Sequence, residues 1–276
     1  MTKKVMTVAK RLRVENPKWE FPDFTAKEFF GKENKYAVCV FVINEGERIQ
    51  KQLMVMRQFA GQVDIIIADG GSTDGSLDLA YLKQMGVRAL LTKKGPGKLS
   101  AQMRMAFAYV LEEGYKGIIV VDGNGKDDTR AIPQFIKLLE EGYDHIQGSR
   151  YIPGGKAINT PLARHLAVQL LHSPLLSLAS RHRHTDTTNG FRAYSRQLLL
   201  DEELNIFRNI FNTYELHYYL AVESARSQKQ YRLIETPVTR TYPKKGKAPT
   251  KISPIRGNVQ ILRILYKAAR RKYRLN

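Results

Sequence analysis

The chain alternates short apolar runs with longer segments in which apolar residues recur every three or four positions. The short runs are rich in β-branched residues, which predicts buried strands: YAVCVFVI (36–43), VDIIIAD (63–69), VRALLTK (87–93), GIIVVD (117–122) and YDHIQGSRY (143–151). The longer segments predict helices. In one of them Leu99, Met103, Ala106 and Val110 share a helical face, and Gly114 ends the segment.

This alternation predicts βαβ units and therefore an α/β fold with one mostly parallel sheet flanked by helices. In such sheets ligands bind at the carboxyl ends of the strands. The unusual polar clusters of the chain all follow predicted strands: Asn44–Glu45, Asp69 to Asp74, Asp122 to Asp128, and Ser149–Arg150. We therefore expect these clusters to form one site.

The pattern changes beyond residue 155. Residues 160–180 form a helix-length apolar segment interrupted at Pro174, and residues 254–274 are amphipathic. In the latter, one predicted stripe is apolar and a second is basic: Ile255, Val259, Leu262, Tyr266 and Ala269, and Arg256, Arg263, Lys267, Arg270 and Arg274. We expect an irregular leader over 1–35 with a short helix, a single domain over 36–252 and a basic amphipathic helix over 253–276.

Composition narrows the class of protein. The 276 residues are 43% hydrophobic and 26% charged, as in an ordinary globular chain. The single cysteine, Cys39, cannot form an intrachain disulfide, and there is neither an apolar stretch of spanning length nor a signal peptide. We expect an intracellular protein, soluble or bound to a membrane surface.

The formal net charge is +19, and no acidic residue follows Glu235, whereas twelve Lys or Arg lie between Arg240 and Arg274. Such a surface attracts phosphate in a nucleotide, a nucleic acid or an anionic lipid. Nucleic-acid binding is only a remote alternative, because no reading motif is present and the carboxylates at the strand ends would repel a phosphate backbone.

The segment Asp122-Gly-Asn124 places a carboxylate and a carboxamide on either side of one glycine. Hard oxygen donors on a sharp loop suit a divalent cation with a diphosphate, and Asp127 and Asp128 are placed to complete or support the site. Alternatively, Asp127 or Asp128 only caps the helix that opens at Thr129.

The segment IADGGSTDGS (67–76) predicts a turn capped by Ser72 or Asp74, and it places Asp69 where a nucleotide base or ribose would be bound. No G-x-G-x-x-G motif supports a dinucleotide site. Asn44 and Glu45 either bind a ligand or simply open a helix. Arg150 and Arg192 each lie beside small residues, which lets a guanidinium approach a phosphate.

Taken in order, these motifs resemble those of family 2 glycosyltransferases of the GT-A fold, and within that family the polyprenyl-phosphate sugar synthases such as dolichyl-phosphate mannose synthase. The resemblance covers about residues 36–255 and rests on six segments: VINEGERI, IADGGSTDGS, VVDGNGKDD, GSRYIPGG, TDTTNGFRAYSR and ETPVTRTYPKKGKAPTKIS.

The resemblance implies a nucleotide-diphosphate sugar as donor, inverting transfer, and Mg²⁺ or Mn²⁺ at Asp122 and Asn124. It implies donor-binding roles for a further set of residues: Asn44, Glu45, Asp69, Asp74, Asp122, Arg150, Lys247 and Lys251. Arg192 and Lys126 are expected to offset phosphate charge during catalysis. Asn124 is a neutral ligand. At the position where the synthase branch can supply a further metal-ligating side chain, this chain has Lys126, so the metal dependence stays open.

The acceptor also stays open. A lipid phosphate is already ionised and can attack unaided, whereas a sugar hydroxyl needs a base. Asp186 is the candidate base, with orientation of Arg192 as its alternative role. The basic tail and the apolar 160–180 segment favour a polyprenyl-phosphate or lipid-linked acceptor at an anionic membrane surface on the cytoplasmic side. A saccharide hydroxyl in surface-polysaccharide assembly is the alternative, and the sequence leaves the oligomeric state undetermined.

Overall fold

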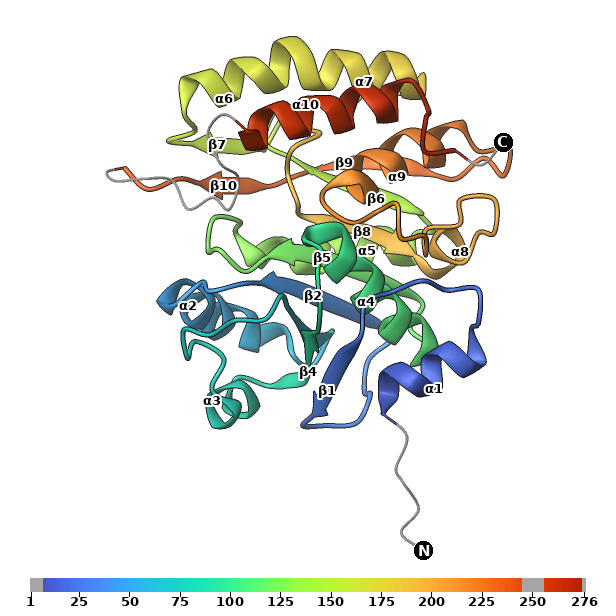
Figure 1. Cartoon of the computed structure of the whole chain (residues 1–276). Helices are drawn as coiled ribbons and strands as arrows, with labels where there is room; N and C mark the ends of the chain where they lie inside the picture. Colours follow the sequence, from blue (N-terminus) through green and yellow to red (C-terminus); the bar gives the residue numbers. More distant parts are fainter. Residues whose placement is uncertain (1–6, 245–255, 275–276) are drawn as a thin grey trace, which may run out of the picture.

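The computed structural model describes residues 7–244 and 256–274 (Figure 1). Its centre is an eight-stranded sheet in the order β1-β4-β3-β2-β5-β8-β6-β9, and a two-stranded sheet pairs β10 with β7. The strands are β1 Phe24–Glu28, β2 Tyr36–Val42, β3 Asp64–Asp69, β4 Val87–Lys93, β5 Gly117–Asp122, β6 His145–Ser149, β7 Lys156–Ile158, β8 Arg192–Ser195, β9 Leu233–Pro237 and β10 Thr239–Thr241.

Most neighbouring strands run in the same direction. β2 is parallel to β3 and β5, β3 to β4, and β6 to β9, whereas β8 is antiparallel to both β5 and β6. The strands β2 to β6 and β9 therefore share one direction, and their carboxyl ends lie on one edge. The predicted α/β fold with a mostly parallel sheet is confirmed.

Helices cover both faces of the sheet (Figure 1). They are α1 Val8–Glu15, α2 Glu47–Met56, η1 Arg57–Phe59, α3 Leu79–Gln84, α4 Leu99–Glu112, η2 Thr129–Ala131, α5 Ile132–Glu140, α6 Leu162–Ala167, η3 Val168–His172, α7 Ser173–Ser180, α8 Arg196–Leu199, α9 Glu215–Arg226 and α10 Arg256–Ala269.

The sequence of β2 is continuously apolar because both faces of this strand are buried. Ala37, Cys39 and Phe41 face one core, which α4 and α1 cover, whereas Val38 and Val40 face the other, which α2, α3 and α5 cover. Successive side chains of a strand point to opposite faces, so a strand covered on both sides has no polar positions. Burial raises the pKa of the Cys39 thiol far above its usual value.

The expected leader over 1–35 does not match the part of it that the structure describes. β1 is an edge strand of the main sheet, antiparallel to β4, and α1 buries Ala9 and Leu12 in the core beneath the sheet. The leader lacks a strong apolar run because one face of β1 is left to solvent: Thr25 and Lys27 are exposed, and only Phe24 is buried. From residue 7 onward this segment is part of the domain.

Pro174 does not break the apolar segment 160–180 into separate pieces. The proline is the second residue of α7, which directly follows a π-helical turn that changes the backbone hydrogen-bond spacing where the proline lacks an N–H. The preceding turn, η3, is a π-helix that carries the chain continuously from α6 to α7. No helix in the described ranges has both the length and the apolar character needed to cross a bilayer.

Gly148, in β6, lies very close to the neighbouring strand. A Cβ there would be 2.6 Å from the backbone oxygen of Phe191, just before β8. We expect Gly148→Ala to destabilise the protein by about 2 kcal/mol, because backbone must move to admit the methyl group. The control is Gly61→Ala, which meets no atom within 4 Å and should stay within about 0.5 kcal/mol. Equal midpoints of the two variants in urea unfolding would contradict this.

Candidate active site

The polar clusters predicted from the sequence lie together at the carboxyl edge of the sheet. Asn44 follows β2, Asp69 ends β3, Asp122 ends β5 and Arg150 follows β6. These four strands run in one direction within one sheet, so their ends converge although they are far apart in the sequence. The strand β10 also lies at this edge. It pairs with β7, and its residue Arg240 forms a β-bridge with Asp127, in the loop after β5.

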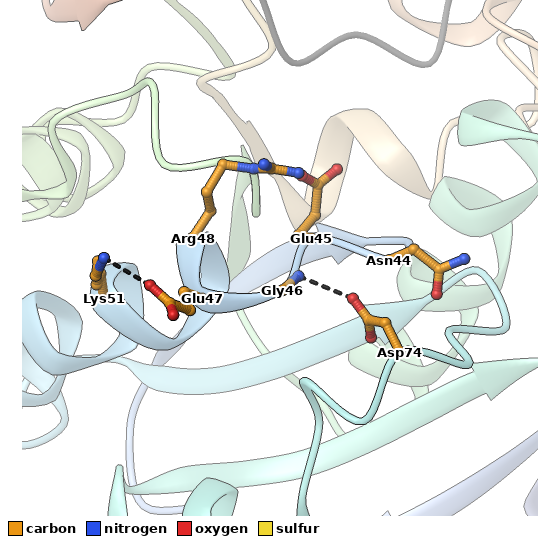
Figure 2. Close-up of a pocket in the computed structure, with 7 residues that line it drawn as sticks. All are labelled: Asn44, Glu45, Gly46, Glu47, Arg48, Lys51 and Asp74. Atoms are coloured by element: carbon orange, nitrogen blue, oxygen red, sulfur yellow. Dashed lines mark hydrogen bonds and ion pairs between the residues drawn. The ribbon is translucent and has the colours of Figure 1, made fainter. Parts of the chain in front are cut away.

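The loops after β2 and β3 are joined by hydrogen bonds. The backbone N–H of Asn44 donates to Ser72 Oγ over 3.0 Å, and the backbone N–H of Thr73 donates to Asn44 Oδ1 over 2.7 Å. Gly46 N donates to Asp74 Oδ2 over 2.8 Å (Figure 2). Asn44 has a φ of 49°, a left-handed conformation that asparagine tolerates well. These contacts fix one wall of the site.

Asp69 is buried, and its Oδ1 accepts from both the backbone and the hydroxyl of Ser72, at 2.8 and 2.7 Å. The sequence alternative for this loop was a helix cap at Ser72 or Asp74. The cap of α3 is instead Asp78, which accepts from Tyr81 N, so Ser72 and Asp74 serve the loop rather than the helix.

A hollow beside these loops is lined by seven residues: Asn44, Glu45, Gly46, Glu47, Arg48, Lys51 and Asp74 (Figure 2). Glu45 is buried at its edge and accepts two hydrogen bonds from Arg48, at 3.1 and 2.9 Å. The hollow therefore presents both acidic and basic side chains to a polar ligand. Three residues expected to bind the sugar donor, Asn44, Glu45 and Asp74, line it.

The loop after β5 holds a compact ion cluster around Arg240. Arg240 Nη2 donates to Asp122 Oδ2 over 3.0 Å, and Nη1 donates to Asp127 Oδ2. Asn124 Nδ2 also donates to Asp122 Oδ2, over 3.2 Å. Lys126 Nζ lies over the ring of Tyr242, 5.2 Å from its centroid. Two protein cations therefore stand at the carboxylates that were expected to bind the diphosphate.

The glycines and one glutamine shape this loop. A Cβ on Gly190 would lie 3.0 Å from Asp122 Oδ1, so the absent side chain leaves room for the carboxylate. Gln52, on α2, donates to the Asp122 carbonyl and accepts from Gly125 N, each over 3.0 Å. Asp128 accepts from Arg130 N at the start of η2, so the capping alternative holds for Asp128 but not for Asp127.

Charges in the cluster oppose the cost of burial. Burial favours a raised pKa for Asp122, but Arg240 and Lys126 outweigh it and hold the pKa below its usual value. Burial raises the pKa of Asp127. Burial, reinforced by the charge of Arg240, lowers the pKa of Lys126. Despite its burial, the two carboxylates raise the pKa of Arg240, so the guanidinium stays charged.

The cluster has unmet hydrogen-bonding capacity. Asp127 Oδ1 and Asn189 Nδ2 are buried and find no partner within the described part of the chain. Buried polar atoms are normally satisfied, so this pair marks a place where water, an ion or a ligand belongs. Asn189 is tied to the cluster because its Oδ1 accepts a long hydrogen bond, 3.4 Å, from Arg240.

The expected metal ligands Asp122 and Asn124 supply oxygen donors of the kind that Mg²⁺ and Mn²⁺ prefer. No group of three or more His, Cys, Asp or Glu side chains among residues 7–244 and 256–274 is arranged to hold a metal ion. These residues therefore fit a divalent cation that takes its other ligands from a diphosphate and water. Arg240 would compete with such an ion for the Asp122 carboxylate.

Asp186 does not lie where a general base must. Its side chain is completely buried, and its two carboxylate oxygens accept from Arg150 Nε and Nη2 over 2.6 and 2.8 Å. The Arg150 backbone N–H adds a third bond, of 3.1 Å. A carboxylate enclosed in this way cannot reach an acceptor hydroxyl, so the expected base role is wrong for this structure. Arg150 directs Nε and Nη2 to Asp186, but its buried Nη1 has no partner within the described residues, so its expected contact with a phosphate stays a prediction.

Arg192 also occupies a structural position. Its three guanidinium nitrogens donate to the carbonyls of Asn189, His217 and Thr187 at 2.8 to 3.0 Å, and its side chain is buried. The expected contact with a phosphate is therefore wrong for this structure. Arg192 instead fixes the loop before β8. The alternative in which Asp186 orients Arg192 fails too, because the partner of Asp186 is Arg150.

Arg240 is the residue that sequence reasoning missed. The sequence showed it only as the first of the twelve bases in the tail. Arg240 is separated from Asp122 and Asp127 by 118 and 113 positions in the sequence. Its contacts with them depend on the pairing of β10 with β7. No local pattern signals such a contact. Lys247 and Lys251 lie outside the described residues.

Comparisons with known proteins identify the family and support the fold. Residues 37–201, more than half of the chain, match the family model described as glycosyl transferase family 2. A comparison with curated protein sequences gave no significant match.

Solved structures of glucosyl-3-phosphoglycerate synthase from Mycobacterium tuberculosis are similar in fold. The complex with Mn²⁺, UDP-glucose and phosphoglyceric acid has a TM-score of 0.60 at 12% identity, covering 98% of this chain and 86% of that one. The complex with UDP has a TM-score of 0.58 at 12% identity, covering 97% and 86%. The complex with Mn²⁺, UDP and glucosyl-3-phosphoglycerate has 0.56 at 13%, covering 97% and 83%.

The parallel sheet, its polar edge and the family match define a glycosyltransferase of the GT-A fold, an enzyme that uses a nucleotide-sugar donor. The chain belongs to glycosyl transferase family 2. The similar structures named above are not polyprenyl-phosphate synthases, so the resemblance to that branch is unconfirmed.

Replacing Arg240 tests the balance of charge in the cluster. In Arg240→Gln, Asp122 and Asp127 lose their shared counter-ion, so stability should fall by about 3 kcal/mol. The two carboxylates should then attract Mn²⁺ without nucleotide. We expect Mn²⁺ to raise the melting temperature of this variant by about 3 °C more than that of the wild type.

The matched control is Arg130→Gln, which removes an exposed arginine that pairs with Asp128 in the same loop. It should respond to Mn²⁺ as the wild type does. Differential scanning calorimetry checks all three proteins. An equal response of Arg240→Gln and the wild type would show that Arg240 does not compete for the metal position.

Proposed function

We propose that the enzyme transfers a sugar from a nucleotide-diphosphate sugar to a polyprenyl-phosphate or lipid-linked acceptor, with inversion, at the cytoplasmic face of a membrane. The observation that carries the donor assignment is the convergence of Asp69, Asp122 and Arg240 at one edge of the sheet. In this proposal Asp69 and the hollow beside Glu45 bind the nucleoside, and the cluster at Asp122 binds the diphosphate.

In the reaction the acceptor oxygen forms a bond to the anomeric carbon while the bond from that carbon to the β-phosphate oxygen breaks. Negative charge builds on the departing diphosphate, and preorganised cations stabilise that charge most. Arg240 and Lys126 are cations held beside Asp122 before the donor arrives. They take the charge-offsetting role that the sequence assigned to Arg192 and Lys126.

A divalent cation fits the same place. Asp122 and Asn124 would hold Mg²⁺ or Mn²⁺ together with the diphosphate, and the ion would supply further charge neutralisation there. The similar synthases contain Mn²⁺ in complex with UDP-glucose or UDP, which supports a metal and a uridine nucleotide for this chain.

The assignment of the acceptor rests on chemistry near the cluster. Asp186, the carboxylate expected to act as a base, is buried against Arg150. An ionised phosphate acceptor needs no base, which favours a polyprenyl phosphate. The similar synthases are in complex with phosphoglyceric acid, which carries a hydroxyl as well as a phosphate and therefore does not discriminate between the two acceptors. A saccharide hydroxyl in surface-polysaccharide assembly is the alternative.

Thermal stability in the presence of nucleotide sugars tests the donor site. UDP-sugars with Mn²⁺ should raise the melting temperature of the wild type by several degrees, since a bound ligand stabilises the folded state. Asp122→Ala should lose most of this shift. Asp128→Ala, in the same loop but at a helix cap, should retain it. Shifts of equal size in wild type and Asp122→Ala would refute the diphosphate assignment.

The pH dependence of transfer distinguishes the two acceptors. With a polyprenyl phosphate the rate should change less than about threefold between pH 7 and 9, because the phosphate is already ionised. The product should be a sugar phosphodiester. A rate that rises about tenfold per pH unit, with a saccharide as the only productive acceptor, would favour the alternative. Asp186→Asn should impair folding and should not discriminate between the acceptors.

A further inference from the structure

A row of leucines lies exposed along the helix that runs through α6, η3 and α7. Leu162, Leu170 and Leu178 expose 71, 74 and 79% of their surface, and Leu166 and Leu171 are exposed as well. The opposite side of the same helix buries Val168, His172 and Leu176. Isolated exposed leucines are ordinary, but a continuous row along one helix marks an interaction surface.

The helix α10 extends this apolar surface. α7 and α10 contact each other and both rest on α9, through a core that includes Leu176, Ile264, Leu265 and Ala268 (Figure 1). The exposed sides of α7 and α10 are those that do not rest on this shared core. The outer side of α10 exposes Val259, Leu262 and Tyr266, the stripe that the sequence singled out as apolar. The helix thus has apolar residues on two faces, and only one of them is used in the fold.

The charge on this surface has one sign. Neither the segment 162–180 nor α10 contains an acidic residue, and Arg263 and Lys267 are exposed beside Leu262 and Tyr266. Arg181 and Arg183, just after α7, are also exposed. Apolar side chains flanked by bases are suited to the interface of a bilayer with anionic headgroups.

We propose that the outer faces of α6, η3, α7 and α10 form a docking surface for an anionic lipid bilayer. A second copy of the chain is a poorer occupant. In a two-fold dimer each copy would bring the same bases to the same contact, and like charges would repel.

The docking surface is connected to the active site. Arg164, on α6, donates to the hydroxyl of Tyr242 over 3.2 Å, and Lys126 lies over the ring of Tyr242. The side chain of Tyr242 therefore lies between α6 and the cluster at Asp122. A lipid-borne acceptor phosphate at this surface would be close to the donor site. This last step rests on the proposed function, whereas the bilayer contact itself does not.

Co-sedimentation with vesicles tests the docking surface. The full chain should bind vesicles of phosphatidylcholine and phosphatidylglycerol, and binding should weaken at high salt and with phosphatidylcholine alone. Leu170→Ser combined with Leu178→Ser should reduce partitioning about tenfold or more, and Arg263→Gln with Lys267→Gln should weaken the preference for anionic lipid about tenfold. The control combines Val14→Ser with Leu79→Ser, which removes exposed apolar side chains from α1 and α3 and should bind as the wild type does.

Circular dichroism should show that every variant is folded, because the replaced side chains are exposed. Wild-type protein that does not bind anionic vesicles, or leucine variants that bind as it does, would overturn the proposal. So would a wild-type dimer in light scattering that the leucine variants dissociate, since the surface would then join two copies. Thermal shifts with UDP-sugars, measured in parallel, distinguish a failure of docking from a failure of the donor site.

Discussion

The ion cluster in which Arg240 bridges Asp122 and Asp127 is the interaction on which the active site depends. Two carboxylates so close together, one of them fully buried, would repel each other without a shared counter-ion. The guanidinium meets that need and also ties β10 to the loop after β5. The pairing of β10 with β7 thus positions Tyr242 and Lys126, and through Tyr242 the helix α6. The cluster connects the sheet edge with the C-terminal part of the described chain.

The same cluster bears on how the enzyme handles phosphate charge. With Asn124 in place of a second carboxylate, the loop has less negative charge with which to attract a divalent ion. Arg240 and Lys126 add positive charge there. In the proposed donor site, a bound diphosphate would bring negative charge to these cations and so increase the attraction for a divalent ion.

Much of the fold could be predicted because its central strands are covered on both faces. β2, β3 and β5 read as apolar runs for that reason, and the polar ends of β2, β3, β5 and β6 could be expected to converge. β1 and β8 escaped prediction, since β1 is an open edge and β8 is a four-residue strand inside a polar segment. The roles of the arginines could not be read from sequence. Arg150 and Arg192 are surrounded by small residues whether they meet a phosphate or, as here, a carboxylate and backbone carbonyls. Composition around an arginine does not reveal its partner.

The helix α10 has an apolar stripe that the sequence predicts and that does not pack on the protein. Its apolar stripe of Val259, Leu262 and Tyr266 would ordinarily mark the side that packs on the protein. The packed side is instead formed by Ile264, Leu265 and Ala268. A helix needs only one apolar face to join a core, and a second one left in water adds nothing to the stability of the fold. The exposed sides of the leucines on α6, η3 and α7 likewise add nothing. Two neighbouring helices with unused apolar faces and no acidic residue are therefore best explained by one common occupant, and a bilayer accounts for both the apolar character and the charge.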